Sequence, residues 1–270
     1  MSPRARLVGW KRVLFGVSVC VACVASVTLT AEPVRVKHVE GLVHGFLALR
    51  TQAGQTIAHG DLIQLVKGDR VTSRLVFRFK DGSVQDETAV FRQRGSFRLI
   101  ADRLVQKGPS FPHPLDMSID AANGMVTVHY ADDGKAKTAA KHIDLPDDLA
   151  NGLMPVLLKN VSSSKPPDHF SMIVATPEPR LIKLAMASSH SERFSMGGES
   201  RVATDFDLKP DIGGLKGLLA PLVGKQPPDV HVWILQGEAP AFLSSEQQFY
   251  PQGPVWRVEL AAPEWPRGEN

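Results

Sequence analysis

The chain has 270 residues, of which 43% are hydrophobic and 22% charged, a composition typical of a globular protein rather than a disordered or fibrous one. Its formal net charge of +3 depends on residues 1–31, which carry four of the 31 basic side chains and no acidic one. The rest of the chain has 27 basic against 28 acidic side chains, a formal charge of −1. A nearly neutral body argues against a basic nucleic-acid-binding protein.

The N-terminal segment has the pattern of a secretory signal peptide. Four basic residues precede an uncharged apolar run, residues 13–27, which is shorter than the roughly 20 residues of a membrane-spanning helix. Ala31 is a small residue suited to cleavage. We therefore expect an exported protein of the periplasm or cell envelope, cleaved after Ala31. The alternatives are an uncleaved anchor and a lipoprotein acylated on Cys23.

Both cysteines, Cys20 and Cys23, fall inside this apolar run. Their C-x-x-C spacing would be removed with the signal peptide, so we interpret it as a coincidence of composition. The predicted mature chain then has no disulfide and no thiolate metal site, and its stability must come from a hydrophobic core.

The first half of the mature chain reads as successive antiparallel strands. Apolar and polar side chains alternate in residues 71–80, Asp81-Gly82 supplies a tight turn, and residues 83–93 return as the partner strand. The alternation continues in residues 97–105, where a strict period of two places Asp102 on the face opposite Phe97 and Leu99. Further strands are predicted at residues 40–51, 57–67, 117–120, 125–130 and 141–145.

The second half combines two predicted helices with more strands. Pro146 and the spacing of the following leucines predict a helix over residues 146–160, which Pro155 should kink or shorten. A second apolar helix is predicted at residues 213–224, either packed on the sheet or acting as a lid or membrane-touching insertion. The remaining predicted strands are residues 170–175, 180–188, 201–208, 230–236 and 255–260.

The order of these elements and two short stretches resemble one known group of proteins. The stretches are residues 77–82, FRFKDG, and residues 253–260, GPVWRVEL. Together they resemble the lipoprotein-carrier-like (Lol-type) periplasmic proteins and their uncharacterised relatives. The resemblance implies a mainly β fold, a strongly curved antiparallel sheet that forms an incomplete barrel or two sheets, with two covering α-helices. It also implies an apolar cavity that receives a lipid or acyl chain.

The predicted organisation has three parts: a signal peptide over residues 1–31, an antiparallel meander with a helix over 32–161, and a continuation of the β fold with a short apolar helix over 162–270. The last part is longer than a minimal carrier needs. The alternative is therefore that it forms a second sheet of its own.

Two sets of side chains are candidates for binding. The first would line an apolar cavity on the concave face, with ordinary packed core as the alternative; it comprises Leu75, Phe77, Phe79, Phe97 and Leu99. The second would contact an anionic membrane surface, with a solvated outer sheet face as the alternative; it comprises Arg74, Arg78, Arg92, Arg94 and Arg98.

The sequence contains no nucleophile elbow, zinc-protease motif, phosphate-binding glycine loop or complete calcium loop. Its nine histidines lack metal-ligand spacing, although folding could still assemble a site from distant ones. We therefore predict no catalytic residue, metal site or cofactor. The leading hypothesis is an envelope protein that binds a hydrophobic or lipid-like ligand. The alternatives are an interaction protein that pairs through its sheet edges and, less favoured, an envelope hydrolase.

Overall fold

The computed structural model describes residues 32–261 except 133, 163–164, 176–177, 197 and 212–226. Its main feature is one antiparallel sheet of 14 strands, with the order β8 to β1 followed by β14 to β9. The strands of the first half are β1 (Val43–Thr51), β2 (Thr56–Lys67), β3 (Arg70–Phe79), β4 (Val84–Arg94), β5 (Ser96–Lys107), β6 (Leu115–Asp120), β7 (Met125–Asp132) and β8 (Lys135–His142). Those of the second half are β9 (His169–Val174), β10 (Arg180–Met196), β11 (Glu199–Asp211), β12 (Val230–Leu235), β13 (Ala241–Gln248) and β14 (Val255–Leu260).

Two meanders of sequence-adjacent hairpins form the two halves of the sheet. Gly82 in the predicted β3–β4 turn has φ 86°, a left-handed conformation that glycine adopts without steric cost. The halves join where the first strand pairs with the last, with Leu47 opposite Leu260 and Thr51 opposite Trp256. This single non-local pairing makes one sheet of the two meanders.

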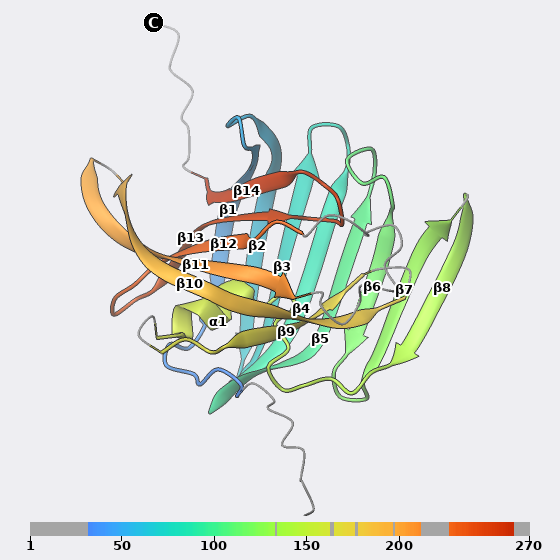
Figure 1. Cartoon of the computed structure of the whole chain (residues 1–270), viewed down its shortest axis with the longest axis horizontal. Coiled ribbons are helices and arrows are strands. Elements are labelled where there is room, and N and C mark those ends of the chain that lie inside the picture. Colours follow the sequence, from blue (N-terminus) through green and yellow to red (C-terminus); the bar gives the residue numbers. More distant parts are fainter. Residues whose placement is uncertain are drawn as a thin grey trace, which may run out of the picture.

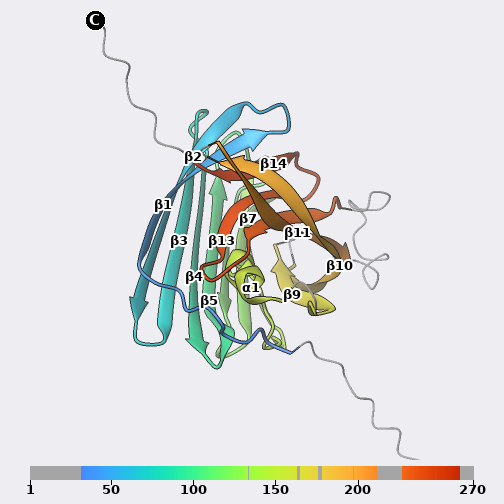
Figure 2. The ribbon, with the colours of Figure 1, turned by 90° about the vertical axis from the view of Figure 1, so that its left-hand side faces the viewer.

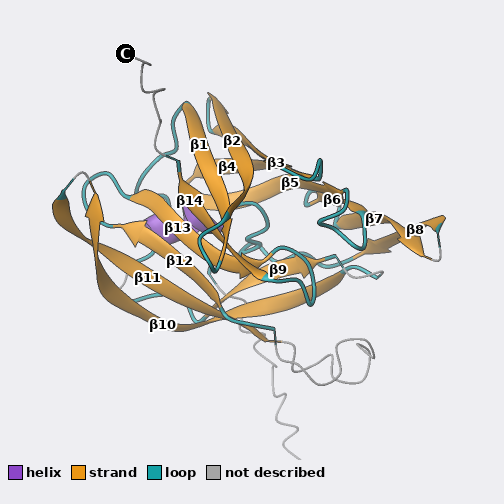
Figure 3. Cartoon of the chain, turned by 90° about the horizontal axis from the view of Figure 1, so that it is seen from above, coloured by secondary structure: helices purple, strands orange, loops and turns teal. Residues whose placement is uncertain are grey.

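The sheet is strongly curved and not closed, since β8 and β9 are its two edges. Strands β1 to β8 form one broad wall, and β9 to β14 return across it as the second wall (Figures 1 and 2). The helix α1 (Met154–Asn160) lies inside the curve and contacts β12 and β13 (Figure 3). The predicted mainly β, strongly curved antiparallel sheet is therefore confirmed.

Two apolar clusters fill the curve. The larger one joins β3 to β7 with α1 and β9 to β12, and Phe97, Leu158 and Phe206 are among its fully buried members. The smaller one surrounds Trp256 of β14, whose ring centroid lies 5.4 Å from that of Phe79. The larger cluster contains residues from before and from after the boundary that was predicted between residues 161 and 162.

Several predicted elements need correction. The second half adds to the same sheet instead of forming a second one. In the described part of the chain there is one helix, and it is half as long as predicted: residues 147–153 form turns, and Pro155 stands in the first turn of α1. The second predicted helix, residues 213–224, lies outside the described residues. Strand β13 was not predicted, because its sequence AFLSSEQQ lacks apolar alternation.

Candidate ligand-binding cavity

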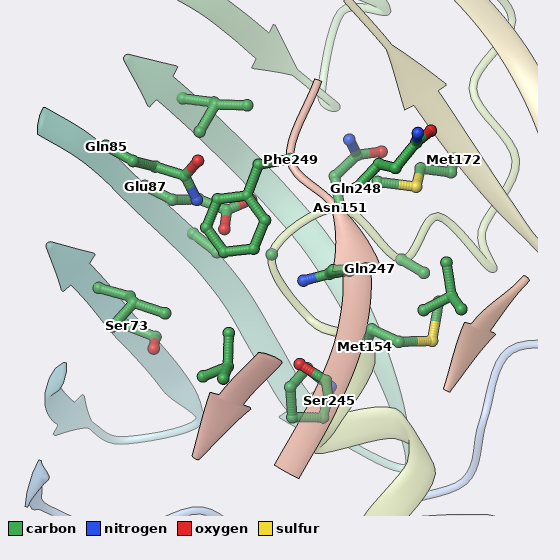
Figure 4. Close-up of a pocket in the computed structure, with 18 of the residues that line it drawn as sticks. Ser73, Gln85, Glu87, Asn151, Met154, Met172, Ser245, Gln247, Gln248 and Phe249 are labelled. Atoms are coloured by element: carbon green, nitrogen blue, oxygen red, sulfur yellow. The ribbon is translucent and has the colours of Figure 1, made fainter. Parts of the chain in front are cut away.

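A cavity of about 1120 Å³ lies within the curve of the sheet. This volume is slightly above the range of about 300–1,000 Å³ that is usual for small-molecule sites. Strands of both walls contribute to its lining, as do α1 and the loop between β13 and β14 (Figure 4). The curvature of the sheet and the interposed helix therefore create the space.

Most of the lining is apolar. Met154 of α1 and Met172 of β9 lie on the same side of the cavity, and Phe249 lies beside Gln85 and Glu87 of the wall (Figure 4). Methionine side chains are flexible and adapt to ligands of different shape. The other large apolar lining residues include Leu47, Leu62, Leu75, Phe77, Leu104, Leu115, Met117, Ile182, Leu184, Val230, Phe242 and Val258.

Polar side chains from three neighbouring strands form one patch on this lining. Ser73 comes from β3, Gln85 and Glu87 from β4, and Gln106 from β5. Gln106 Nε2 donates hydrogen bonds to Gln85 Oε1 at 2.7 Å and to the backbone carbonyl of Phe249 at 2.8 Å. The carbonyl oxygen of the Gln106 side chain is buried and has no partner among the described residues. The patch thus keeps hydrogen-bonding capacity within an apolar cavity.

Two carboxyl groups at this patch form no ion pair with a basic side chain in the part of the chain that the structure describes. Glu87 faces the cavity, and Asp102 of β5 is 2% exposed, with neither carboxyl oxygen hydrogen-bonded to a described residue. Burial raises the pKa of Glu87 to about 7. Burial, followed by the proximity of Glu87, raises the pKa of Asp102 well above its ordinary value. Below pH about 7 the Glu87 carboxyl is therefore mostly protonated, and a protonated carboxyl can donate a hydrogen bond.

A β-bulge explains why Asp102 points inward. Val90 pairs with Ala101 and Phe91 pairs with Leu99, so Ile100 is an extra residue in β5. Phe97 and Leu99 are buried before the bulge, and Asp102 and Gln106 are buried after it. The predicted strict alternation over residues 97–105 is therefore wrong, since the bulge reverses which residues face inward.

The loop before α1 approaches the carboxyl pair closely. Gly152 has φ 63°, and a Cβ atom there would lie 2.6 Å from Ala89 Cβ and 3.0 Å from Asp102 Oδ1. Only glycine fits this contact without displacement. A separate buried ion pair, Lys159 Nζ to Glu40 Oε1 at 2.6 Å, also lines the cavity.

The predicted cavity residues divide into two groups. Leu75 and Phe77 line the cavity, as the hypothesis requires. Phe79 packs in the cluster around Trp256, and Phe97 and Leu99 pack in the larger cluster. Glu87, Met154 and Met172 also line the cavity, and none of them was predicted from the sequence. Alternation could have placed Glu87 on the inner face with Gln85, but the positions of the methionines depend on packing between the walls.

The five arginines of the predicted anionic-surface contact lie outside the cavity. Four of them have acidic partners: Arg74 with Asp86 at 2.5 Å, Arg78 with Asp61 at 2.9 Å, Arg92 with Asp69 at 3.8 Å, and Arg98 with Asp147. Arg94 is exposed beside the β4–β5 turn. The positive charge of these arginines is therefore largely balanced by neighbouring carboxylates. Their contact with an anionic membrane stays a prediction.

No family model matches the sequence, and comparison with curated proteins and with solved structures found no match. Among the described residues, no helix is both long and apolar enough to cross a membrane.

Proposed function

We propose that this protein is an exported envelope protein that binds a lipid-like molecule in the cavity of the curved sheet. The observation that carries the proposal is the cavity of about 1120 Å³, whose apolar lining comes from both walls and α1. Transfer of an alkyl chain from water into such a lining is favourable by about 0.8 kcal/mol per buried CH₂ group.

The polar patch indicates where the ligand's polar end lies. Glu87 and Gln106 line the cavity, and the side-chain carbonyl oxygen of Gln106 has no hydrogen-bond partner among the described residues. A head group with a carbonyl or hydroxyl oxygen would accept a hydrogen bond from the protonated Glu87 carboxyl. The apolar body would then extend past Leu75 and Phe77 toward α1. The curved sheet with an interposed helix also agrees with the architecture implied by the resemblance to Lol-type carriers.

The alternative, pairing with a partner protein through a sheet edge, has less support. Edge strand β8 carries Lys135, Lys137 and Lys141, and lysines on an edge oppose strand addition. Along the other edge, Asn151 accepts a hydrogen bond from the Ile173 N–H and donates one to its carbonyl, each at 2.8 Å. Part of the β9 edge is therefore already occupied.

Gly45 allows the cavity to be filled without disturbing the strand. It lines the cavity, and a Cβ atom there would have its nearest neighbours, in Leu62 and Val43, at 3.8–3.9 Å. We expect Gly45→Leu to weaken binding of a fluorescent fatty acid at least about tenfold, because part of the volume is taken. Gly41→Leu is the matched control, since nothing lies within 4 Å of its Cβ position and it does not line the cavity.

Native mass spectrometry and organic extraction of the purified protein provide the direct measurement. A lipid-sized adduct in the wild type that is reduced in Gly45→Leu and kept in Gly41→Leu would support the proposal. An apo mass with no uptake of added fatty acid or phospholipid would overturn it and favour the interaction-protein alternative.

A further inference from the structure

Four potential metal ligands gather on the outer face of β10, β11 and β12, away from the cavity. Asp205 of β11 is paired with His190 of β10 on one side and with Trp233 of β12 on the other. His231 precedes Trp233 by two residues in β12, so both lie on the same face of the sheet. Glu192 follows His190 on the same face of β10. The neighbouring residues Phe206, Leu208, Val232 and Ile234 are buried in the core, so the alternation directs this cluster outward.

Three of these residues lie close enough to share one ion. His190, Glu192 and Asp205 offer ligand atoms within 4.8 Å of one another. His190 Nε2 lies 3.4 Å from Asp205 Oδ2, and zinc–ligand bonds of about 2.0–2.2 Å give tetrahedral ligand–ligand separations of about 3.3–3.6 Å. His231 joins the cluster through Asp205, because its Nδ1 is hydrogen-bonded to the same oxygen at 3.3 Å.

Asp205 supplies independent evidence of a missing partner. Its side chain is 3% exposed, and Oδ1 has no hydrogen-bond partner among the described residues. A buried carboxylate is costly unless it is paired or coordinates a metal. The two imidazoles contact only the other oxygen, Oδ2. A cation at this position would therefore offset an otherwise unfavourable burial.

Trp233 holds two residues of this cluster in place. Its Nε1 donates a hydrogen bond to Glu192 Oε2 at 2.6 Å, and its ring stacks on His231 with a centroid distance of 5.8 Å and an interplanar angle of 24°. Such contacts behind the ligands fix their orientation in metal sites. Trp233 is thus a positioning residue, not a ligand.

We propose that His190, Asp205 and Glu192 bind one divalent transition-metal ion, for which Zn²⁺ is the best fit, and that His231 orients Asp205 through its hydrogen bond. Imidazole nitrogens combined with carboxylate oxygens match its ligand preference. Since the ligands come from β10 and β11, the ion would tie together the two strands of this hairpin, and the hydrogen bond from His231 would connect it to β12. Its role would be to stabilise strands β10 to β12, independently of the cavity and of any bound lipid.

The test measures zinc binding by the full chain after treatment with a chelator. Isothermal titration calorimetry with ZnCl₂ should show a 1:1 site, and thermal unfolding should shift upward on zinc addition. We expect His190→Gln to weaken binding at least about tenfold. Because His190 is 58% exposed, this substitution should leave the fold intact. His231→Gln should have the same effect on zinc affinity.

The matched control is His129→Gln on β7, which removes an exposed histidine that contacts Thr138, outside the cluster. It should bind zinc as the wild type does. Equal zinc affinity in the wild type, His190→Gln and His231→Gln would overturn the proposal, as would no binding by the wild type at millimolar zinc. Either result would leave Asp205 as the centre of a hydrogen-bonded histidine cluster only.

Discussion

The carboxyl groups of Glu87 and Asp102 show how one residue's environment sets its charge. Both lie against apolar side chains and beside each other, and both have raised pKa values. Burial is the largest cause of both shifts, and the backbone N–H of Arg103 opposes the shift of Asp102 only in part. Because the ionised forms are disfavoured in this setting, the pair reduces stability whenever the pH forces it to ionise.

Glu87 makes this effect measurable. Its pKa rises from the ordinary 4.5 to about 7 on folding, so the folded state holds a proton that the unfolded state loses across this range. The contribution is fully present below pH about 4.5 and declines as the pH rises toward about 7, by on the order of 1–3 kcal/mol. We expect Glu87→Gln to remove this decline, so the variant gains stability relative to the wild type as the pH rises.

Urea unfolding at pH 4.5, 6 and 8 gives the comparison. Glu199→Gln, which alters an exposed carboxylate paired with Arg201, should follow the wild type. A constant difference between Glu87→Gln and the wild type at all three pH values would show that Glu87 ionises normally.

At the element scale, the loop before α1 substitutes for a strand along the β9 edge. Besides the two hydrogen bonds between Asn151 and Ile173, the Ala150 N–H donates to the Ser171 carbonyl at 2.9 Å, and Asp148 Oδ2 accepts from the Ser171 N–H at 3.1 Å. The loop thus satisfies backbone groups that an edge strand would otherwise present for pairing.

Asn151→Leu would test this role. The substitution leaves the N–H and C=O of Ile173 buried without their side-chain partner, and each such group costs about 1–3 kcal/mol. We expect the free energy of unfolding to fall by at least about 2 kcal/mol and amide exchange at Ile173 to accelerate. Unchanged stability and exchange would show that the loop is dispensable for this edge.

For the whole molecule, the critical contact is the β1–β14 pairing that unites the two meanders. Trp256 lies at this junction and packs against Phe79, Phe111, Phe249 and Tyr250, with ring centroids 5.2–6.2 Å apart. Phe249 and Tyr250 also line the cavity. The junction between the walls and the proposed binding site therefore share the same aromatic cluster.

We expect Trp256→Ala to lower the free energy of unfolding by about 3–5 kcal/mol, the range for removing a buried aromatic side chain. It should also weaken fatty-acid binding, because Phe249 loses one of its two aromatic packing partners and keeps only Phe77 among the described rings. Trp256→Phe should cost less in both measurements, which are urea unfolding and fluorescence titration. A loss below about 1 kcal/mol for Trp256→Ala would contradict this role.

Local sequence patterns determined much of the architecture. Alternation in β3 and the turn at Asp81-Gly82 predicted the β3–β4 hairpin, and the same reasoning predicted most of the meander, because both signals act between residues close in the chain. The same pattern predicted Leu75 and Phe77 as cavity residues; both line the cavity, and their contact with a ligand stays a prediction. A polar strand such as β13 carries no such signal, so it was missed.

Only the tertiary structure decided the rest. The bulge at Ile100 turned Asp102 inward, α1 brought Met154 into the cavity, and strand register placed His190, Asp205 and His231 together. These outcomes depend on pairing and packing between segments far apart in sequence. The free energy of such contacts is gained only when the whole sheet forms, and therefore no local pattern in the sequence encodes them.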